Sequence, residues 1–343
     1  MQTIKGIQLN NFSQIKAISF YLPEKKLSNE DLFREFGTLT SNEIFKRVGV
    51  KERRIRGVGE IGSDLAFKSS QLLFEEHGID KKEIDFLLFC TEGLDYKGPA
   101  TACIMQERLG LRKSVGAMDV PMGCAGFTNG LVVAKALIES GQFKHVLLQT
   151  ADIPSSVIHP NDLELRMLFG DAGASTLISA SEEKGIGDFI VGTDGSGAQD
   201  LIVRKSNTRT PVDEEWLREH ADAGGMVFGR MEMDGLEVFS FSMREVPKMV
   251  NQILEKNELT LDDIDLFVFH QANSFILKML ARKLQLQQEK VYNCMEYMGN
   301  TVSASVPIAL YCAQQEGKIP QGSKVLIAAF GIGFSWSGTV LRY

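Results

Sequence analysis

The chain carries the same pattern of residues twice, about 180 positions apart, and this repeat strongly limits its possible folds. Residues 82–90 match residues 262–270 in character at each position, with Ile-Asp followed by a short apolar run. An apolar helical pattern precedes each run, over residues 65–76 in the first half and 238–254 in the second. Short continuous apolar runs of this kind are typical of strands buried on both faces in a parallel sheet.

A second pair of segments extends the repeat. Residues 123–126 open a helical pattern of small residues, and an apolar strand pattern follows at 146–148. Residues 299–305 open a similar pattern, followed by an apolar run at 325–329. Each half therefore has the order helix, buried strand, loop, helix, buried strand, which predicts two similar α/β lobes and not a solenoid.

The repeat also predicts how the chain is divided. We expect one lobe over residues 1–180 and a second over 234–343. The Gly-, Asp- and Ser-rich segment 181–233 has no counterpart and is expected to form connections and surface loops. Local signals place helix ends within the first lobe: Ser28 precedes acidic residues as an N-cap, and Gly78 and Gly141 follow helical patterns.

Composition excludes several classes of protein. No apolar run of the 343 residues reaches the length of a membrane span, and the start of the chain lacks the apolar region of a signal peptide. The net charge of -7 argues against general nucleic-acid binding. The five cysteines form no CxxC pair or zinc-type spacing, which predicts reduced thiols in the cytoplasm and no metal site.

Cys124 is the first candidate catalytic residue. It stands where the small-residue helix begins, beside backbone N–H groups without partners and the positive end of the helix dipole. Both would favour the thiolate, which is the nucleophilic form of cysteine. A free cysteine can also be buried as a small apolar residue, and for a cysteine considered alone that is the commoner outcome.

His270 and Asn300 are the second and third candidates. His270 opens the polar loop His-Gln-Ala-Asn273 directly after the buried strand pattern. Asn300 lies in Gly-Asn-Thr301, where a helix cap or a turn is the commoner role. If the two halves are related by a pseudo-dyad, their strand ends and helix starts meet in the middle, where α/β folds bind ligands. The remaining histidines lack such a setting: His77, His145, His159 and His220.

A glycine-rich turn at 330–338 adds a possible anion site. Phe-Gly-Ile-Gly-Phe-Ser-Trp-Ser-Gly has no following lysine and helix, so it is neither a P-loop nor a dinucleotide fingerprint. Its backbone N–H groups could instead stabilise a developing oxyanion.

These motifs together resemble one known family. GCAGF at Cys124, HQAN at His270, GNT at Asn300 and the closing FGxGFSW segment are similar to β-ketoacyl-acyl-carrier-protein synthase III, a thiolase-fold condensing enzyme. Further matches occur in the family's order over nearly the whole chain, at 169–174, 193–196 and 234–239.

The resemblance implies a five-layered αβαβα thiolase-like fold, a homodimer and an acyltransferase activity. Cys124 would take an acyl group from an acyl-CoA or acyl-carrier-protein thioester. His270 and Asn300 would hold the thioester carbonyl of malonyl carrier protein during decarboxylation, and the carbanion would attack the acyl-cysteine. Backbone N–H groups of Cys124, Ile332 and Gly333 would form the oxyanion hole. This decarboxylative Claisen condensation would serve fatty acid initiation or a related lipid pathway, and it would need no metal or redox cofactor.

The resemblance also assigns substrate-binding residues. Arg47 matches an arginine that contacts the CoA end of the donor, and Arg282 and Lys283 match a basic pair that docks the carrier protein. Two basic positions of the family are absent, with Leu163 and Phe275 in their place. The tryptophan that stacks on the CoA adenine in the best-known members also has no counterpart near residues 43–44.

Gly98 is the difference from the family with the largest expected effect on the choice of acyl donor. It stands where the family commonly has a Phe that closes the acyl pocket across the dimer, so a larger pocket and an acyl donor longer than acetyl are expected. Ile332 replaces the middle glycine of the usual closing turn. The alternatives are a specialised ketide synthase, a cysteine acyltransferase or a non-condensing partner subunit, although such a subunit has no need of all three polar residues.

Overall fold

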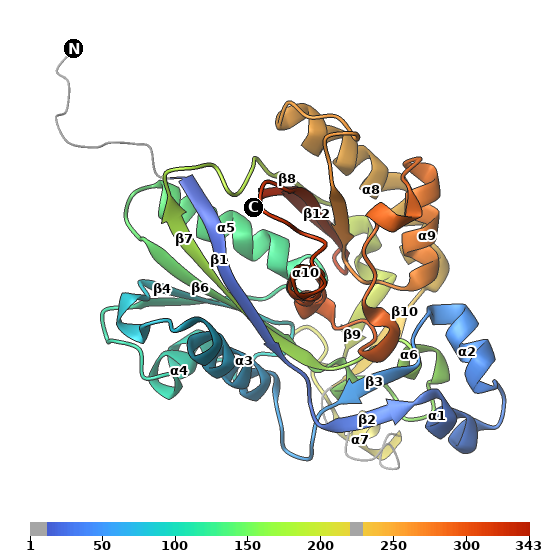
Figure 1. The fold of residues 1–343 in the computed structure, drawn as a ribbon. Coiled ribbons are helices and arrows are strands. Elements are labelled where there is room, and N and C mark those ends of the chain that lie inside the picture. Colours follow the sequence, from blue (N-terminus) through green and yellow to red (C-terminus); the bar gives the residue numbers. More distant parts are fainter. Residues whose placement is uncertain (1–11, 220–228) are drawn as a thin grey trace.

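The computed structural model describes residues 12–219 and 229–343. Two sheets are stacked with helices between them and on their outer faces (Figure 1). The first sheet has five strands in the order β1-β7-β6-β4-β5. Their bounds are β1 Phe12–Tyr21, β4 Phe86–Cys90, β5 Gly116–Val120, β6 His145–Asp152 and β7 Ala172–Ser181.

The second sheet repeats the pairing of the first. Its order is β11-β12-β13-β8, and β11 is parallel to β12 as β4 is to β6. The antiparallel pairs β12–β13 and β13–β8 correspond to β6–β7 and β7–β1. The bounds are β8 Ile190–Thr193, β11 Leu266–Phe269, β12 Lys324–Gly331 and β13 Ser335–Arg342. The repeat in the sequence therefore corresponds to a repeat of the strand topology in the two sheets.

The boundary of the second lobe differs from the expected one. β8 lies inside segment 181–233, yet it is the edge strand of the second sheet, in the position that β1 has in the first. The segment also forms the two-stranded sheet of β9 (Leu201–Arg204) and β10 (Arg230–Met233). Because β8 has only four residues and none of them is fully buried, its sequence lacks the apolar run that marks the central strands.

Helices form three layers around the two sheets, which gives the expected five-layered αβαβα arrangement. α5 and α10 fill the middle layer, and α5 contacts both sheets (Figure 1). α3 and α4 cover the outer face of the first sheet, and α8 and α9 cover the second. The bounds are α3 Gly62–His77, α4 Thr101–Arg108, α5 Gly126–Glu139, α8 Gly235–Lys256, α9 Ser274–Lys283 and α10 Ser305–Gln315.

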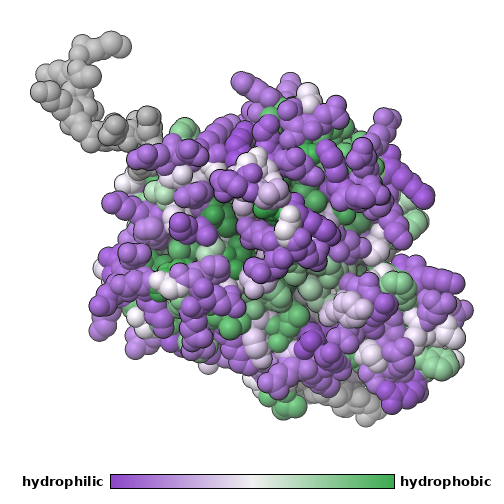
Figure 2. All heavy atoms as spheres, in the orientation of Figure 1, coloured by the Kyte–Doolittle hydropathy of each residue, from purple (hydrophilic) through white to green (hydrophobic). Residues whose placement is uncertain are grey.

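The apolar core follows these layers. One cluster of buried side chains lies between the sheets around α5 and α10, a second between α3 and the first sheet, and a third under α8 and α9. Hydrophilic residues cover most of the face in Figure 2, and apolar residues show in the crevices between them. Among the described residues, no helix is long and apolar enough to cross a membrane.

A small unit at one edge joins β1 to α3. It consists of β2 (Lys25–Ser28), α1 (Asn29–Phe36), α2 (Ser41–Val48) and β3 (Glu52–Ile55). Ser28 caps α1 as predicted, with a reciprocal hydrogen bond from its backbone N–H to Asp31. α3 ends at Gly78, whose left-handed φ of 60° closes the helix as the sequence predicted. Two further helices are short: α6 Leu163–Arg166 and α7 Glu214–Glu219.

Candidate active site

Cys124 lies in the loop between β5 and α5, two residues before the first residue of α5, as the sequence predicted. Its side chain is buried, with 6% of the residue exposed. The turn after β12 covers the sulfur so closely that a Cβ on Gly331 would lie 2.6 Å from Sγ. Only glycine fits at this position, and the next residue, Ile332, donates its backbone N–H to the sulfur.

The electrostatic surroundings of Cys124 do not favour the thiolate that its place at a helix start suggested. Burial raises the pKa of Cys124 to about 12, and the carboxyls of Glu92 and Asp152 add to that rise. The N–H groups of Ile332 and Cys124 act in the opposite direction but do not offset it. Cys124 is therefore a thiol in the resting protein, because desolvation and like charge outweigh the helix N-terminus.

His270 follows β11 directly and is 2% exposed. Its Nδ1 lies 2.7 Å from the hydroxyl of Ser305, the first residue of α10. The same hydroxyl also accepts the backbone N–H of Gln271 at 3.4 Å. When the hydroxyl donates its proton to Nδ1, the ring proton lies on Nε2. Burial lowers the pKa of His270 to about 3, so the imidazole is a neutral donor at neutral pH.

The Asn300 side chain is held in one orientation. Its Oδ1 accepts the backbone N–H of Val302 at 2.9 Å, and its Nδ2 donates to the carbonyl of Ala272 at 3.3 Å. The residue is 4% exposed. One N–H of the amide remains for a ligand, and the amide cannot turn over without losing both bonds.

Three contacts bring these residues to one buried centre. The Asn300 amide bonds to Ala272, two residues after His270. The ring of Phe330 packs edge-on against the imidazole, with centroids 5.8 Å apart. Phe330 is followed by Gly331, which lies on the sulfur of Cys124. The strand ends and helix starts of the two lobes thus meet as the pseudo-dyad predicted.

The other predicted site residues lie further out. Gly98 is on the exposed loop between β4 and α4, and apart from its chain neighbours no described residue has an atom within 4 Å of the position its Cβ would take. Arg47 is exposed in the last turn of α2, which packs on α9, and Arg282 and Lys283 are exposed in the last turn of α9. Within the described ranges, none of these three cations forms an ion pair. Gly333 follows Ile332 in the same turn, between β12 and β13.

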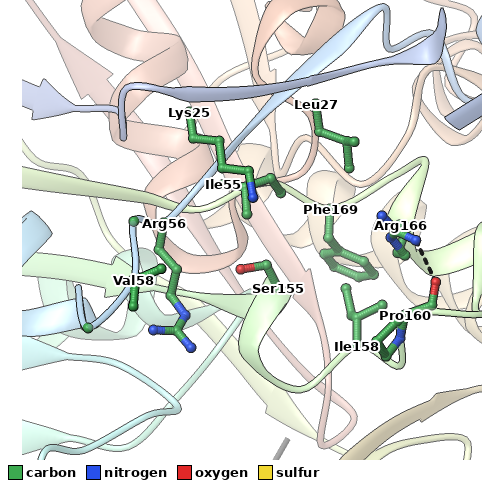
Figure 3. Close-up of a pocket in the computed structure, with 12 residues that line it drawn as sticks. Lys25, Leu27, Ile55, Arg56, Val58, Ser155, Ile158, Pro160, Arg166 and Phe169 are labelled. Atoms are coloured by element: carbon green, nitrogen blue, oxygen red, sulfur yellow. Dashed lines mark hydrogen bonds between the residues drawn. The ribbon is translucent and has the colours of Figure 1, made fainter. Parts of the chain in front are cut away.

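A surface cleft of about 380 Å³ lies near this centre but does not contain it. Figure 3 shows Lys25, Arg56 and Arg166 around an apolar floor that includes Ile158 and Phe169. The backbone of Phe169 pairs with that of Asn300, so the cleft adjoins the Asn300 loop from outside. None of the predicted site residues lines it.

Sequence reasoning missed four residues that the structure places around the centre. They are Glu92, Asp152, Ser305 and Phe330. Ser305 and Phe330 stand inside quoted motifs, five residues after Asn300 and one before Gly331. Glu92 follows β4 and Asp152 is the last residue of β6, as His270 follows β11. A polar residue at the end of a buried strand was therefore the sequence signal that could have identified them.

Comparison with known proteins agrees with this geometry. The two stacked lobes define a thiolase-fold enzyme. One crystal structure of a 3-oxoacyl-(acyl-carrier-protein) synthase III superposes with a TM-score of 0.92 at 38% identity, covering 97% of this chain and 100% of that one. The priming β-ketosynthase from the R1128 polyketide biosynthetic pathway superposes with a TM-score of 0.85 at 30% identity, covering 96% of each chain.

The sequence comparison identifies the family. Residues 118–195 match 3-oxoacyl-[acyl-carrier-protein (ACP)] synthase III, and residues 254–343 match the C-terminal part of the same family. A β-ketoacyl-[acyl-carrier-protein] synthase III of Campylobacter curvus (strain 525.92) is 37% identical over 328 residues, covering 95% of this chain and 96% of that protein. The chain belongs to the 3-oxoacyl-acyl-carrier-protein synthase III family, as its motifs predicted.

Proposed function

We propose that the protein condenses an acyl thioester with malonyl carrier protein by a decarboxylative Claisen reaction, as an initiating enzyme of fatty acid synthesis. The observation that supports this most is the pair of neutral donors at the buried centre. His270 and Asn300 each have an N–H left for a ligand, and the nucleophile Cys124 lies at the same centre. Such a pair suits an enolate oxygen, whose charge develops only during the reaction.

Loading comes first. The sulfur of Cys124 attacks the carbonyl carbon of the donor thioester while its proton is transferred to the departing thiol. The C–S bond of the donor breaks, and an acyl-cysteine remains. The Ile332 N–H, which already points at the sulfur, and the Cys124 N–H would hold the tetrahedral oxyanion, and Gly333 would add a third donor.

Condensation follows on the acyl-enzyme. The bond between the malonyl carboxylate and its Cα breaks, CO₂ leaves, and the electron pair forms an enolate whose oxygen accepts from His270 and Asn300. The Cα then attacks the acyl carbon, the bond to Cys124 breaks, and the departing thiolate of Cys124 takes up a proton from water. The steps require no metal or redox group, because N–H donors meet each developing charge.

Three exposed basic residues are proposed to bind the substrates. Arg47 would contact the phosphate-bearing end of an acyl-CoA, and Arg282 and Lys283 would dock an acyl carrier protein. Their guanidinium and ammonium groups are exposed and form no ion pair with any residue that the structure describes, which suits phosphate and acidic surfaces. We place the reaction in the cytoplasm, in keeping with five free thiols.

A homodimer is part of the proposal. β5 is the edge strand of the first sheet and is only partly buried, with Met118 40% exposed. Leu94 and Tyr96 are also exposed, on the loop after β4 that carries Gly98. An open sheet edge beside exposed apolar residues suits pairing with a second copy. That pairing would bring the Gly98 loop of one chain toward the acyl site of the other.

A second candidate function is priming of a specialised lipid or polyketide with a longer acyl group. The residue Gly98 favours it, because a glycine in place of the family's Phe would leave a larger acyl pocket. The polyketide-priming relative agrees with this only at the level of the family.

The proposal is tested by separating loading from condensation. Asn300→Ala and His270→Ala should still form an acyl adduct on Cys124, seen by intact-protein mass with a series of acyl-CoAs. Condensation with malonyl carrier protein should fall about 10²- to 10³-fold, the usual effect of losing one such donor. Cys124→Ser is the control that should form no stable thioester adduct. Unchanged condensation in Asn300→Ala would refute the assigned role.

A further inference from the structure

Arg53 on β3 is a fully buried arginine to which the proposed mechanism gives no role. It is 0% exposed, and no carboxylate in the described parts of the chain forms an ion pair with it. Its guanidinium donates to neutral oxygens: Nη1 to the carbonyl of Leu27 at 2.9 Å, and Nη2 to Oδ1 of Asn29 at 2.8 Å and to the carbonyl of Met167 at 2.6 Å. Because arginine is almost never fully buried without a counter-ion, these three contacts need an explanation.

The bond to Met167 ties Arg53 to the short segment that holds the backbone of Asn300. The carbonyl of Leu168 accepts the backbone N–H of Asn300 at 2.9 Å, and Gly170 donates its own N–H to the carbonyl of Asn300 at 3.0 Å. The segment therefore holds Asn300 on both sides of its Cα. It begins directly after the carbonyl group to which the guanidinium of Arg53 donates.

The stem of Arg53 packs against this segment and also against the turn that carries Asn300. A Cβ on Gly170 would lie 3.2 Å from the Cβ of Arg53 and 2.2 Å from the carbonyl oxygen of Met298. A Cβ on Gly299, the residue before Asn300, would lie 3.3 Å from the Cβ of Arg53. Gly299 also has a left-handed φ of 71°, which favours glycine at this position. Arg53 thus contacts both pieces of chain that determine where Asn300 lies.

The position of the Asn300 amide depends on this support. Its donor bond to Ala272 is long, at 3.3 Å, and its bond from Val302 lies within the same turn. The two backbone bonds of Asn300 are shorter, and they fix the turn against the first lobe. A misplacement of about 1 Å can cost a reaction about 10²-fold, so a small shift of this turn would matter for the amide N–H.

We propose that Arg53 is a positioning residue for Asn300: it holds the segment 167–170 and the turn 298–299 so that the free amide N–H of Asn300 meets the enolate oxygen. An arginine suits this place, because one planar guanidinium can donate to three oxygens in fixed directions. Arg53 contacts no reacting atom in this scheme. It has no part in loading, since Cys124 lies at the start of α5. The inference rests on the proposed function, in which Asn300 is one of the two enolate donors.

The test measures loading and condensation separately in the full-length protein. Loading of Cys124 is followed by intact mass, and condensation by a single turnover of the acyl-enzyme with malonyl carrier protein. Arg53→Met keeps an unbranched stem and removes the guanidinium. Condensation should fall about 10- to 100-fold, while loading stays within about twofold. Arg53→Lys, which can still donate from one nitrogen, should recover part of the loss. Arg54→Met is the matched control with unchanged condensation, because Arg54 is the next residue of β3 and its guanidinium donates to Pro23 at 3.1 Å.

A cycle with Asn300→Ala separates positioning of the amide from general damage to the structure. Once the Asn300 amide is gone, Arg53→Met should slow condensation by less than about twofold more. The same fold loss with and without the amide would overturn the inference, as would unchanged condensation in Arg53→Met alone. If Arg53→Met does not fold, Arg53→Lys is put through the same cycle with the same two outcomes.

The two failures can be told apart. Slow condensation in Asn300→Ala together with normal condensation in Arg53→Met would refute this inference and leave the proposed function standing. Normal condensation in Asn300→Ala, or no acyl adduct on Cys124 from any donor, would refute the proposed function and this inference with it.

Discussion

The hydroxyl of Ser305 makes a sharp prediction about His270. In the structure it is the group that meets Nδ1, at 2.7 Å, and both residues are buried. Ser305→Ala removes this donor and leaves a buried acceptor without a partner, which costs about 1–3 kcal/mol. Without the hydroxyl, Nδ1 has no partner in either tautomer, so the preference that this bond gives to the proton on Nε2 is lost. The tautomer with the proton on Nε2 should then become about 5- to 150-fold less favoured, and condensation should slow by a similar factor.

The assay starts from the acyl-enzyme, so that loading does not contribute. Cys124 is first acylated to completion, malonyl carrier protein is then added, and product is followed in a single turnover. Ser69→Ala is the matched control, because Ser69 also loses a buried hydroxyl bond of 2.7 Å, to Ser175, but lies on α3 away from His270. Condensation in Ser305→Ala within twofold of the unmodified protein would refute the tautomer argument.

The same assay carries a pH test. Because the pKa of His270 is lowered to about 3, the ring gains a proton only below that pH, and the neutral donor persists from about pH 5 to 8. Condensation from the acyl-enzyme should therefore not fall on acidification to about pH 5. A loss near pH 6.5, the ordinary range of histidine, would show that the ring titrates with solvent and would contradict its assignment as a buried neutral donor.

Two further predictions concern the nucleophile and the assembly. Gly331→Ala would place a methyl group 2.6 Å from the sulfur, so loading of Cys124 should fall about 100-fold by intact mass; full loading would mean that the turn does not cover the sulfur as described. Met118→Lys should convert a dimer into a monomer in sedimentation, since a charge on an exposed edge strand opposes pairing. A monomeric unmodified protein would rule out the proposed assembly.

The sequence was sufficient for the parts of the fold that local pattern determines. β4 and β11 were both predicted because an apolar run buried on both faces has a distinct composition. The start of α1 followed from the N-cap Ser28, and the end of α3 followed from Gly78. The start of α5 followed from the small residues after Cys124. The convergence of Cys124, His270 and Asn300 could be predicted from the repeat alone, since equivalent strand ends meet once the lobes are paired.

The features missed from the sequence depend on contacts between distant segments. β8 is an edge strand whose role comes from pairing with β13, and its four residues carry no long pattern of their own. The protonation state of Cys124 was predicted from its helix alone. Burial of the thiol is the main cause that reverses this prediction. Glu92 and Asp152, which add to it, come from the ends of β4 and β6, 32 residues before and 28 residues after Cys124. A local motif does not show the charges of residues that are far away in sequence.

Asp152 explains why the site tolerates a negative charge near its nucleophile. Its carboxylate joins the ends of β4 and β6 in the first lobe to Ser303, in the loop that holds Asn300 in the second. Removing this charge would favour the thiolate but would also release the bond that places the Asn300 loop. A network that positions one catalytic group thus lowers the reactivity of another. The arrangement is consistent with an enzyme that must keep its cysteine unreactive until a thioester is bound.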